Sequence, residues 1–168
     1  MGRVRRAAGV PLAGDRQGGH VSPSPPGGVT SPGGLSFSVY GPPVAQGRPR
    51  TARLPAGNIR VFDPPASRDF KQHVRMQALA ALGGRPRLLE GALELQLSVQ
   101  LCRPRSAPKR LWPDVKPDLS NYLKGVEDAM IGVAFRDDAQ IVRMSLDKHY
   151  GPEPGVAIRL TPLGQGEP

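Results

Sequence analysis

Five carboxylates lie within 21 residues of a chain whose formal net charge is +9. They are Asp118, Glu127, Asp128, Asp137 and Asp138. Carboxylates gathered so closely repel one another, so solvent, nearby arginines or a metal ion must offset the repulsion. Carboxylate oxygens suit Mg²⁺, which commonly takes one or two carboxylates and keeps several waters. A metal site is therefore one hypothesis for this cluster.

Each acidic residue also has an ordinary structural interpretation. Asp118 would be a helix N-cap, and Glu127 would form a solvated i,i+3 pair with Lys124. Asp137 and Asp138 would form a turn. Singly, these interpretations are favoured. Together they are weaker, because Asp118 and Asp138 bracket one helix and can converge at its N-terminal end.

A helix over residues 119–131 must position these side chains. Its apolar residues recur at i, i+3, i+4 and i+7, which predicts one stripe facing the core. That stripe is Leu119, Tyr122, Leu123, Val126 and Met130. The opposite stripe is polar: Ser120, Asn121, Lys124, Glu127 and Asp128. Asp118 lies where a carboxylate can meet the positive end of the helix dipole.

Apolar and polar residues alternate in four further segments, which predicts four strands with one buried face each. The segments are residues 35–41, 91–103, 139–151 and 155–162. The third is expected to bury Val142, Met144 and Leu146, and a turn at residues 151–155 predicts that the last two strands form a hairpin.

A second helix is predicted from Ser67, as N-cap, to about Leu82. Its buried stripe would be Phe70, Val74, Ala78 and Ala81. Residues 42–65 are rich in Pro, Gly and Arg and are predicted to be a loop. The expected fold is α+β, with a mainly antiparallel sheet of about four strands and two main helices.

The chain divides into three parts by composition. Residues 1–34 hold 9 Gly and 5 Pro and no aromatic residue, so they are expected to be a disordered extension and not a secretory signal. Residues 35–163 would form one domain, and residues 164–168 a flexible tail. The single cysteine, Cys102, excludes intramolecular disulfides and multi-cysteine metal sites, and a reducing cytoplasm is the simplest compartment.

The charge points to a polyanionic partner. Lys and Arg total 23 against 14 acids, and the pI is about 10.6, which favours nucleic acid. Aromatic residues make up only 5% of the chain, which argues against a stacking platform for single strands. Backbone phosphate contact with a duplex or a junction fits better.

The motif residues resemble the RusA-type Holliday-junction resolvases, also called crossover junction endodeoxyribonucleases. The matching residues are Lys116-Pro117-Asp118-Leu119-Ser120-Asn121, Lys124, Asp128-Ala129, Gly132 and Asp137-Asp138-Ala139-Gln140. The stretch VYGPPVAQGRPR resembles the opening strand and basic loop of that family. The resemblance spans roughly residues 36–162.

The resemblance implies a Mg²⁺-dependent endodeoxyribonuclease, with Mn²⁺ as a substitute, that nicks opposed strands of a four-way junction in recombination and repair. It also implies a RusA-like fold, a homodimer, and a bacterial or phage origin. Asp118, Lys124 and Asp138 match catalytic positions. The implied metal ligands are Asp118 and Asp138, with Asp137 and Glu127 as further candidates. Supporting positions are Ser120, Asn121, Asp128 and Gln140.

DNA arms would be seated by basic side chains through phosphate contacts. These are Arg48, Arg50, Arg53, Arg60, Arg103, Arg105, Lys109 and Arg110. The alternative is that they form a solvated basic surface.

Ser120 departs from the family pattern, which has Asp at this position. A serine hydroxyl is a poorer metal ligand, so one expected carboxylate is missing. Glu127 lies on the same helical face and could restore an acid, but seven residues rise about 10 Å along a helix. Alternatively, the chain is a weakened enzyme that binds junctions but cuts poorly. A basic RNA-binding protein is a third reading, with a plainly solvated acidic helix.

Overall fold

The computed structural model describes residues 33–48, 50–53 and 59–164. The predicted disordered extension lies outside the described residues except for Gly33 and Gly34, and the predicted tail does so except for Gly164. The elements, in chain order, are β1 (Leu35–Tyr40), β2 (Arg50–Arg53), β3 (Ile59–Phe62), α1 (Pro65–Ala81), β4 (Leu93–Cys102), α2 (Leu119–Met130), a 3₁₀ turn (Asp138–Gln140), β5 (Ile141–Gly151) and β6 (Gly155–Pro162).

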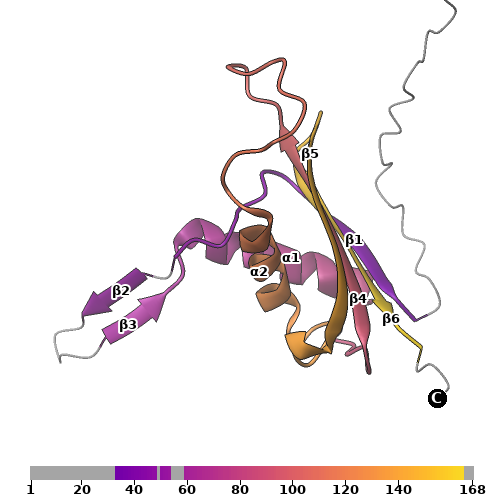
Figure 1. The fold of residues 1–168 in the computed structure, drawn as a ribbon. Coiled ribbons are helices and arrows are strands. Elements are labelled where there is room, and N and C mark those ends of the chain that lie inside the picture. Colours follow the sequence, from indigo (N-terminus) through magenta and orange to yellow (C-terminus); the bar gives the residue numbers. More distant parts are fainter. Residues whose placement is uncertain (1–32, 49, 54–58, 165–168) are drawn as a thin grey trace, which may run out of the picture.

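A four-stranded sheet with the order β1-β6-β4-β5 forms one layer, and α1 and α2 form the second layer on one of its faces (Figure 1). The pairs β1–β6 and β6–β4 are antiparallel, whereas β4–β5 is parallel. Two of the three pairings are thus antiparallel. The predicted α+β fold with a mainly antiparallel sheet and two main helices is confirmed.

The core lies between the sheet and the helices. In β4 the predicted alternation is realised: Leu93, Leu95, Leu97 and Val99 are at most 1% exposed. Close approach of β1 to β6 requires glycine at Gly155, because a Cβ there would lie 2.8 Å from the carbonyl oxygen of Val39. Buried side chains of β1, β4 and β6 thus form the sheet side of this core.

The predicted hairpin of the last two strands is wrong. β4 lies between β5 and β6 and pairs with both, so the chain after β5 must cross to the far side of β4. A short turn is compatible with a hairpin, but apolar alternation does not say which strands become neighbours.

β5 is an edge strand, and its predicted burial is also wrong. Val142 is 64% exposed and Met144 is 44% exposed, while Leu146 is half-buried. The β4–β5 register shifts between Leu93 and Glu94, and Val142 falls in that irregularity. An edge strand has a neighbour on one side only, so its apolar side chains are covered less completely.

Helix α1 begins three residues earlier than predicted: its N-cap is Pro64 in place of Ser67, and its first residue is Pro65, which is tolerated in a first turn. Ser67 is therefore not the N-cap. It is buried, its hydroxyl accepts a hydrogen bond from the Gly47 amide at 3.2 Å, and it donates to the Ala45 carbonyl at 3.4 Å. The predicted stripe is confirmed at its first three positions, Phe70, Val74 and Ala78, but Ala81 is exposed.

Residues 42–65 are not only a loop. They contain β2 and β3, which pair antiparallel as a separate two-stranded sheet. Figure 1 shows this pair standing away from the main sheet and the helices. Among the described residues, no helix has the length and apolar character needed to cross a bilayer.

Candidate active site

Helix α2 runs from Leu119 to Met130, close to the predicted bounds. Tyr122, Val126 and Met130 are buried as predicted. On the other side, Ser120, Lys124 and Glu127 lie within about 60° of one another around the axis, because successive residues turn by about 100°. Ser120 and Lys124 are exposed and Glu127 is half-buried. This polar face carries the candidate site.

Asp118 occupies the N-cap position of α2, as predicted. Its side chain is exposed and, within the described residues, makes no capping hydrogen bond. Only its backbone carbonyl acts in the cap, accepting from the Asn121 amide at 3.1 Å. Lys148 of β5 fixes the preceding chain by donating to the carbonyls of Val115 (2.8 Å) and Pro117 (3.0 Å). The Asp118 carboxylate is therefore not used in capping.

The chain turns sharply after α2 to reach the second acidic pair. Gly132 adopts a φ of +73°, which favours glycine, and its amide donates to the Phe135 carbonyl at 2.8 Å. Val133, Ala134 and Phe135 are fully buried. This apolar anchor fixes where the following turn begins.

The Asp-Asp-x-Gln motif divides into structural and free groups. Gln140 accepts from the amides of Arg136 (2.8 Å) and Asp137 (3.3 Å), and its amide group donates to the carbonyls of Leu89 (3.0 Å) and Gly91 (3.1 Å). Asp137 accepts from the Ala139 amide at 2.9 Å. Asp138 is exposed, and its carboxylate makes no hydrogen bond or ion pair with the part of the chain that the structure describes. Asp137 and Gln140 thus hold the turn, and Asp138 is left available.

Glu127 and Asp138 interact electrostatically. Burial raises the pKa of Glu127, the negative charge of Asp138 raises it further, and Lys124 partly opposes the rise. Asp128 adds a smaller increase to this pKa. A carboxylate with a raised pKa is less stable in its ionised form, so the pair favours a compensating cation. The structure therefore brings together Lys124, Glu127 and Asp138.

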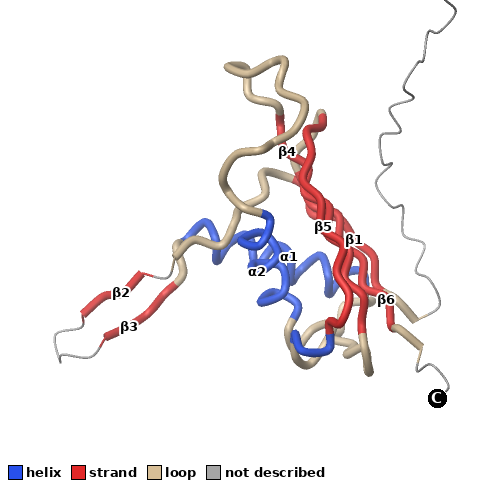
Figure 2. The backbone as a smooth tube through the Cα atoms, in the orientation of Figure 1, coloured by secondary structure: helices blue, strands red, loops and turns tan. Residues whose placement is uncertain are grey.

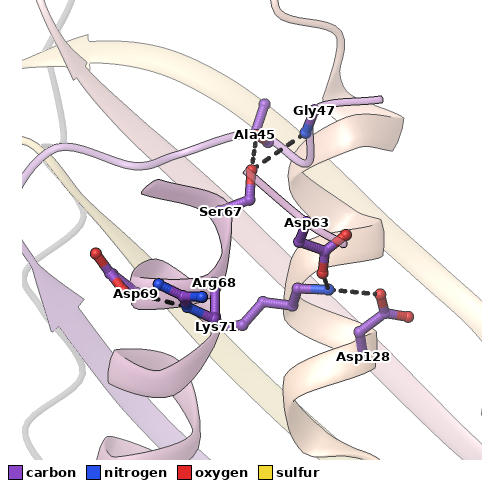
Figure 3. Close-up of polar contacts among 8 residues, drawn as sticks. All are labelled: Ala45, Gly47, Asp63, Ser67, Arg68, Asp69, Lys71 and Asp128. Atoms are coloured by element: carbon purple, nitrogen blue, oxygen red, sulfur yellow. Dashed lines mark hydrogen bonds and ion pairs between the residues drawn. The ribbon is translucent and has the colours of Figure 1, made fainter. Parts of the chain in front are cut away.

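Asp128 has a different environment. Lys71 of α1 donates to Asp128 at 3.1 Å and forms an ion pair with Asp63 (Figure 3). The three side chains are only 18%, 33% and 26% exposed, respectively. Burial alone would lower the pKa of Lys71, but the hydrogen bonds and charges of the two carboxylates outweigh it and raise that pKa. Asp128 therefore links α2 to α1 and to the end of β3.

The four predicted metal ligands are not assembled as one set. Among the described residues, no three His, Cys, Asp or Glu side chains lie close enough to hold a metal ion. Asp118 precedes Glu127 by nine residues, which is about 13 Å along a helix axis. Asp137 already accepts a backbone hydrogen bond. Which carboxylates hold an ion stays a prediction.

The predicted DNA-binding residues fall on two segments. One segment is the β2–β3 pair, which contains Arg50, Arg53 and Arg60; the structure does not describe the side chains of these three arginines. Arg48, just before β2, is exposed. The other four predicted residues lie in the loop between β4 and α2. This loop comprises residues 103–118 and is called the β4–α2 loop. In that loop Arg105 and Lys109 are exposed. Arg103 and Arg110 make contacts within the loop.

Sequence reasoning missed Lys71, Asp63 and Lys148. Lys71 lies 57 residues from Asp128, and Lys148 lies 31 residues from Pro117, so no local spacing reveals these two contacts. Asp63 enters through its ion pair with Lys71. The signal available for Lys71 is its position beside the buried Phe70, at the edge of the apolar stripe. It could have indicated a partly buried lysine in need of a partner.

The sequence model described as Endodeoxyribonuclease RusA matches residues 40–161, and the chain belongs to this family, the RusA-type Holliday-junction resolvases. A curated relative is the uncharacterized protein YqaN of Bacillus subtilis (strain 168). It is 36% identical over 138 residues, which covers 75% of this chain and 94% of that protein.

Proposed function

We propose that this chain is a Mg²⁺-dependent endodeoxyribonuclease that resolves four-way DNA junctions in recombination and repair by hydrolysing phosphodiester bonds. The observation that carries the proposal is the exposed carboxylate of Asp138, in a turn that Asp137 and Gln140 hold beside α2, in a chain of the RusA family. Residues 35–163 form the nuclease domain in this account, and cell cytoplasm is the expected location.

The residues present fit a divalent cation. Glu127 and Asp138 provide oxygen ligands of the type that Mg²⁺ prefers, and Mg²⁺ needs only one or two carboxylates because it keeps several waters. The raised pKa of Glu127 means that a cation between the two groups would relieve an existing repulsion. Asp118, with its carboxylate unused in capping, is a further candidate ligand at the N-terminal end of α2. When bound, such a cation supplies Lewis-acid polarisation of a phosphoryl oxygen and a more acidic water.

The chain's own groups account for positioning and charge. Lys124 is exposed and lies one helical turn from Glu127, where its ammonium can stabilise charge that develops on the phosphate. Asp137 and Gln140 keep Asp138 in place by bonding to backbone groups. Lys71 and Asp128 hold α2 at a fixed position relative to α1. Catalysis of phosphoryl transfer depends mainly on such positioning and electrostatic stabilisation.

The basic segments on either side of α2 would seat the DNA. Strands β2 and β3, which contain Arg50, Arg53 and Arg60, come just before α1, and Arg105 and Lys109 lie in the β4–α2 loop. In Figure 1 the β2–β3 pair projects to the left of α2 and the β4–α2 loop projects above it. Phosphate contacts with both segments would place a strand across the polar face of the helix.

A homodimer would explain the exposed side chains of β5. The outer edge of β5 has no neighbouring strand in the described sheet, and Val142 and Met144 are exposed there. Exposed apolar edge strands are templates for pairing with another chain. We place the dimer contact at β5, so that two copies present two sites to opposed strands.

A weakened, junction-binding derivative is the second candidate. It is favoured by Ser120, which replaces a family carboxylate, and by the absence of a three-carboxylate group among the described residues. It would bind junctions with strong salt dependence and leave them intact at every Mg²⁺ or Mn²⁺ concentration.

The test is incubation of the purified protein with a synthetic four-way junction and a linear duplex of the same sequence, with and without Mg²⁺. Nicking of the junction alone, abolished by EDTA, supports the proposal. Tight binding without nicking supports the derivative. Structured RNA that displaces the junction at equal concentration would instead indicate an RNA-binding protein.

A further inference from the structure

The β4–α2 loop is held in shape by its own side chains. Arg103 donates to the carbonyls of Pro108 (3.1 Å) and Arg110 (2.7 Å), and its guanidinium lies over the Tyr150 ring at 5.2 Å from the centroid. The Ala107 amide donates to Pro104 at 3.0 Å, and the Arg110 amide donates to Ala107 at 3.2 Å. The first half of the loop is therefore a structured turn.

The second half is fixed as well. Arg110 pairs with Asp114 at 3.5 Å, and Pro113 is buried. Lys148 of β5 holds the carbonyls of Val115 and Pro117. Leu111 and Trp112 therefore lie between two parts of the loop that hydrogen bonds and an ion pair hold in place.

Leu111 and Trp112 nevertheless face solvent. Leu111 is 75% exposed and Trp112 is 67% exposed. These apolar side chains have not been turned inward, although the loop around them is ordered. Adjacent exposed apolar residues on an ordered surface mark an interaction site.

The surroundings of this pair indicate the kind of partner. Arg105, Lys109 and Lys116 are exposed in the same loop, which suits a polyanion better than an apolar protein surface. Figure 2 shows the loop leading directly into the start of α2, where Asp118 lies. A nucleic acid that contacts the loop would therefore also reach the N-terminal end of α2, where the polar face of the helix begins.

We propose that Trp112, supported by Leu111, stacks on a base exposed at the branch point of a DNA junction and thereby selects branched over linear DNA. The proposal rests on the junction substrate proposed above. In a linear duplex both faces of an internal base are covered by its neighbours, whereas a branch point offers base faces at lower unstacking cost. A single indole is enough for such a contact, although the chain is too poor in aromatic residues for a longer stacking platform.

Trp112 is the only tryptophan, so its fluorescence reports on this contact alone. The protein is titrated in EDTA with an immobile four-way junction or a linear duplex of matched sequence, and binding is followed separately by the anisotropy of a dye on the DNA. We expect the bound junction, but not the bound duplex, to quench Trp112 and to protect it from acrylamide. Unchanged fluorescence at junction saturation would overturn the proposal.

Substitutions provide the second arm. Trp112→Ala is expected to weaken junction binding by about tenfold and duplex binding little, while Trp112→Phe retains most of the affinity. Met76→Ala is the control, because Met76 is an exposed apolar residue, 58% exposed, on α1. Melting curves confirm that each variant folds. Equal weakening of junction and duplex by Trp112→Ala would contradict selective stacking.

Two further outcomes separate the inference from its alternatives. A fluorescence change with protein concentration in the absence of DNA, matched by a change in mass on gel filtration, would assign Trp112 to a protein contact and overturn the proposal. Because the titration uses no cleavage, junction-specific quenching without nicking would sustain this inference while the proposed nuclease activity fails. Nicking without quenching would do the reverse.

Discussion

Asp138 lies close enough to Glu127 for its negative charge to raise the pKa of that glutamate, although the two residues belong to different elements, the turn before β5 and helix α2. Burial of Glu127 contributes most to the rise, and Lys124 opposes it. The molecule therefore keeps a destabilised carboxylate, Glu127, beside Asp138, which forms no ion pair among the described residues.

This pair predicts a pH-dependent stability gain for Glu127→Gln in metal-free protein. The ordinary pKa of Glu127 is 4.5 and the folded-state value is higher. As the pH rises through this window, the folded protein retains the proton that the unfolded chain loses, so the free energy of unfolding falls. Below the window both states are protonated and the penalty is absent.

The melting temperature of Glu127→Gln should therefore exceed that of the wild type at pH 7 in EDTA, and the difference should disappear near pH 4. Differential scanning calorimetry at both pH values measures it. Glu90→Gln, at an exposed glutamate, is the control and should show no gain. A pH-independent difference for Glu127→Gln would mean that the charge is not responsible.

The acid on the helix face should also affect nicking. Glu127→Ala is expected to lower the Mg²⁺-dependent nicking rate by about tenfold or more, because a group that supports a metal site is lost. Ser120→Asp is expected to raise the rate, since it restores the carboxylate that the family pattern has. Single-turnover nicking across a Mg²⁺ titration measures both. An unchanged nicking rate in Glu127→Ala would contradict the hypothesis that Glu127 compensates for Ser120.

Lys71 should matter for stability and for the position of α2. Lys71→Met leaves Asp63 and Asp128 partly buried without their cation, which should lower the free energy of unfolding by about 1–3 kcal/mol at neutral pH. Because the pKa of Lys71 is raised from 10.5, its contribution is present at lower pH and is lost as the pH rises through the folded-state value.

Urea unfolding measures the effect of Lys71→Met. The matched control is Arg68→Met, which removes a surface pair with Asp69 that is 69% and 74% exposed and should cost less than about 0.5 kcal/mol. A double-mutant cycle with Asp128→Asn isolates the link between the helices. Equal effects of Lys71→Met and Arg68→Met would show that burial does not strengthen the Lys71 network.

The sequence predicted the features that depend on residues close together in the chain, and it missed those that depend on contacts between distant segments. The periodicity from Leu119 to Met130 predicted α2 because core-facing residues recur within one helix, and the alternation in β4 worked for the same reason. In β5 an identical alternation misled, because an edge strand paired in parallel leaves Val142 and Met144 exposed. Local patterns identify the element but not its neighbours.

The candidate site was predictable to a similar extent. The motif pointed to Asp138 and Lys124. It did not show that Gln140 holds the turn while Asp138 stays available, because Gln140 bonds to Leu89 and Gly91, which are far away in the sequence. The sequence pattern suggested that Asp138 could approach the N-terminal end of α2. The turn that begins at Gly132 instead brings Asp138 near enough to Glu127 to raise its pKa. Such contacts are set by the tertiary fold.

The proposed dimer contact at β5 predicts that Val142→Lys yields a monomer. A lysine on an exposed edge strand disfavours pairing with a second chain, and Val142 is 64% exposed, so the monomer itself should fold normally. Sedimentation equilibrium determines the mass, and Ser145→Lys, on the same strand and also exposed, shows whether charge alone is sufficient. A wild-type monomer at micromolar concentration would contradict the dimer.

The most direct test of the central claim is strand-resolved nicking of a mobile four-way junction by the wild type and by Asp138→Asn, with junction affinity measured in parallel. The account predicts that the wild type nicks opposed strands only when Mg²⁺ is present. It predicts that Asp138→Asn loses at least about a hundredfold in rate while binding the junction as tightly, because an amide is a poor ligand but leaves the turn held by Asp137 and Gln140 intact. Equal cleavage by the two proteins would contradict the assignment of the active site to this acidic helix and turn.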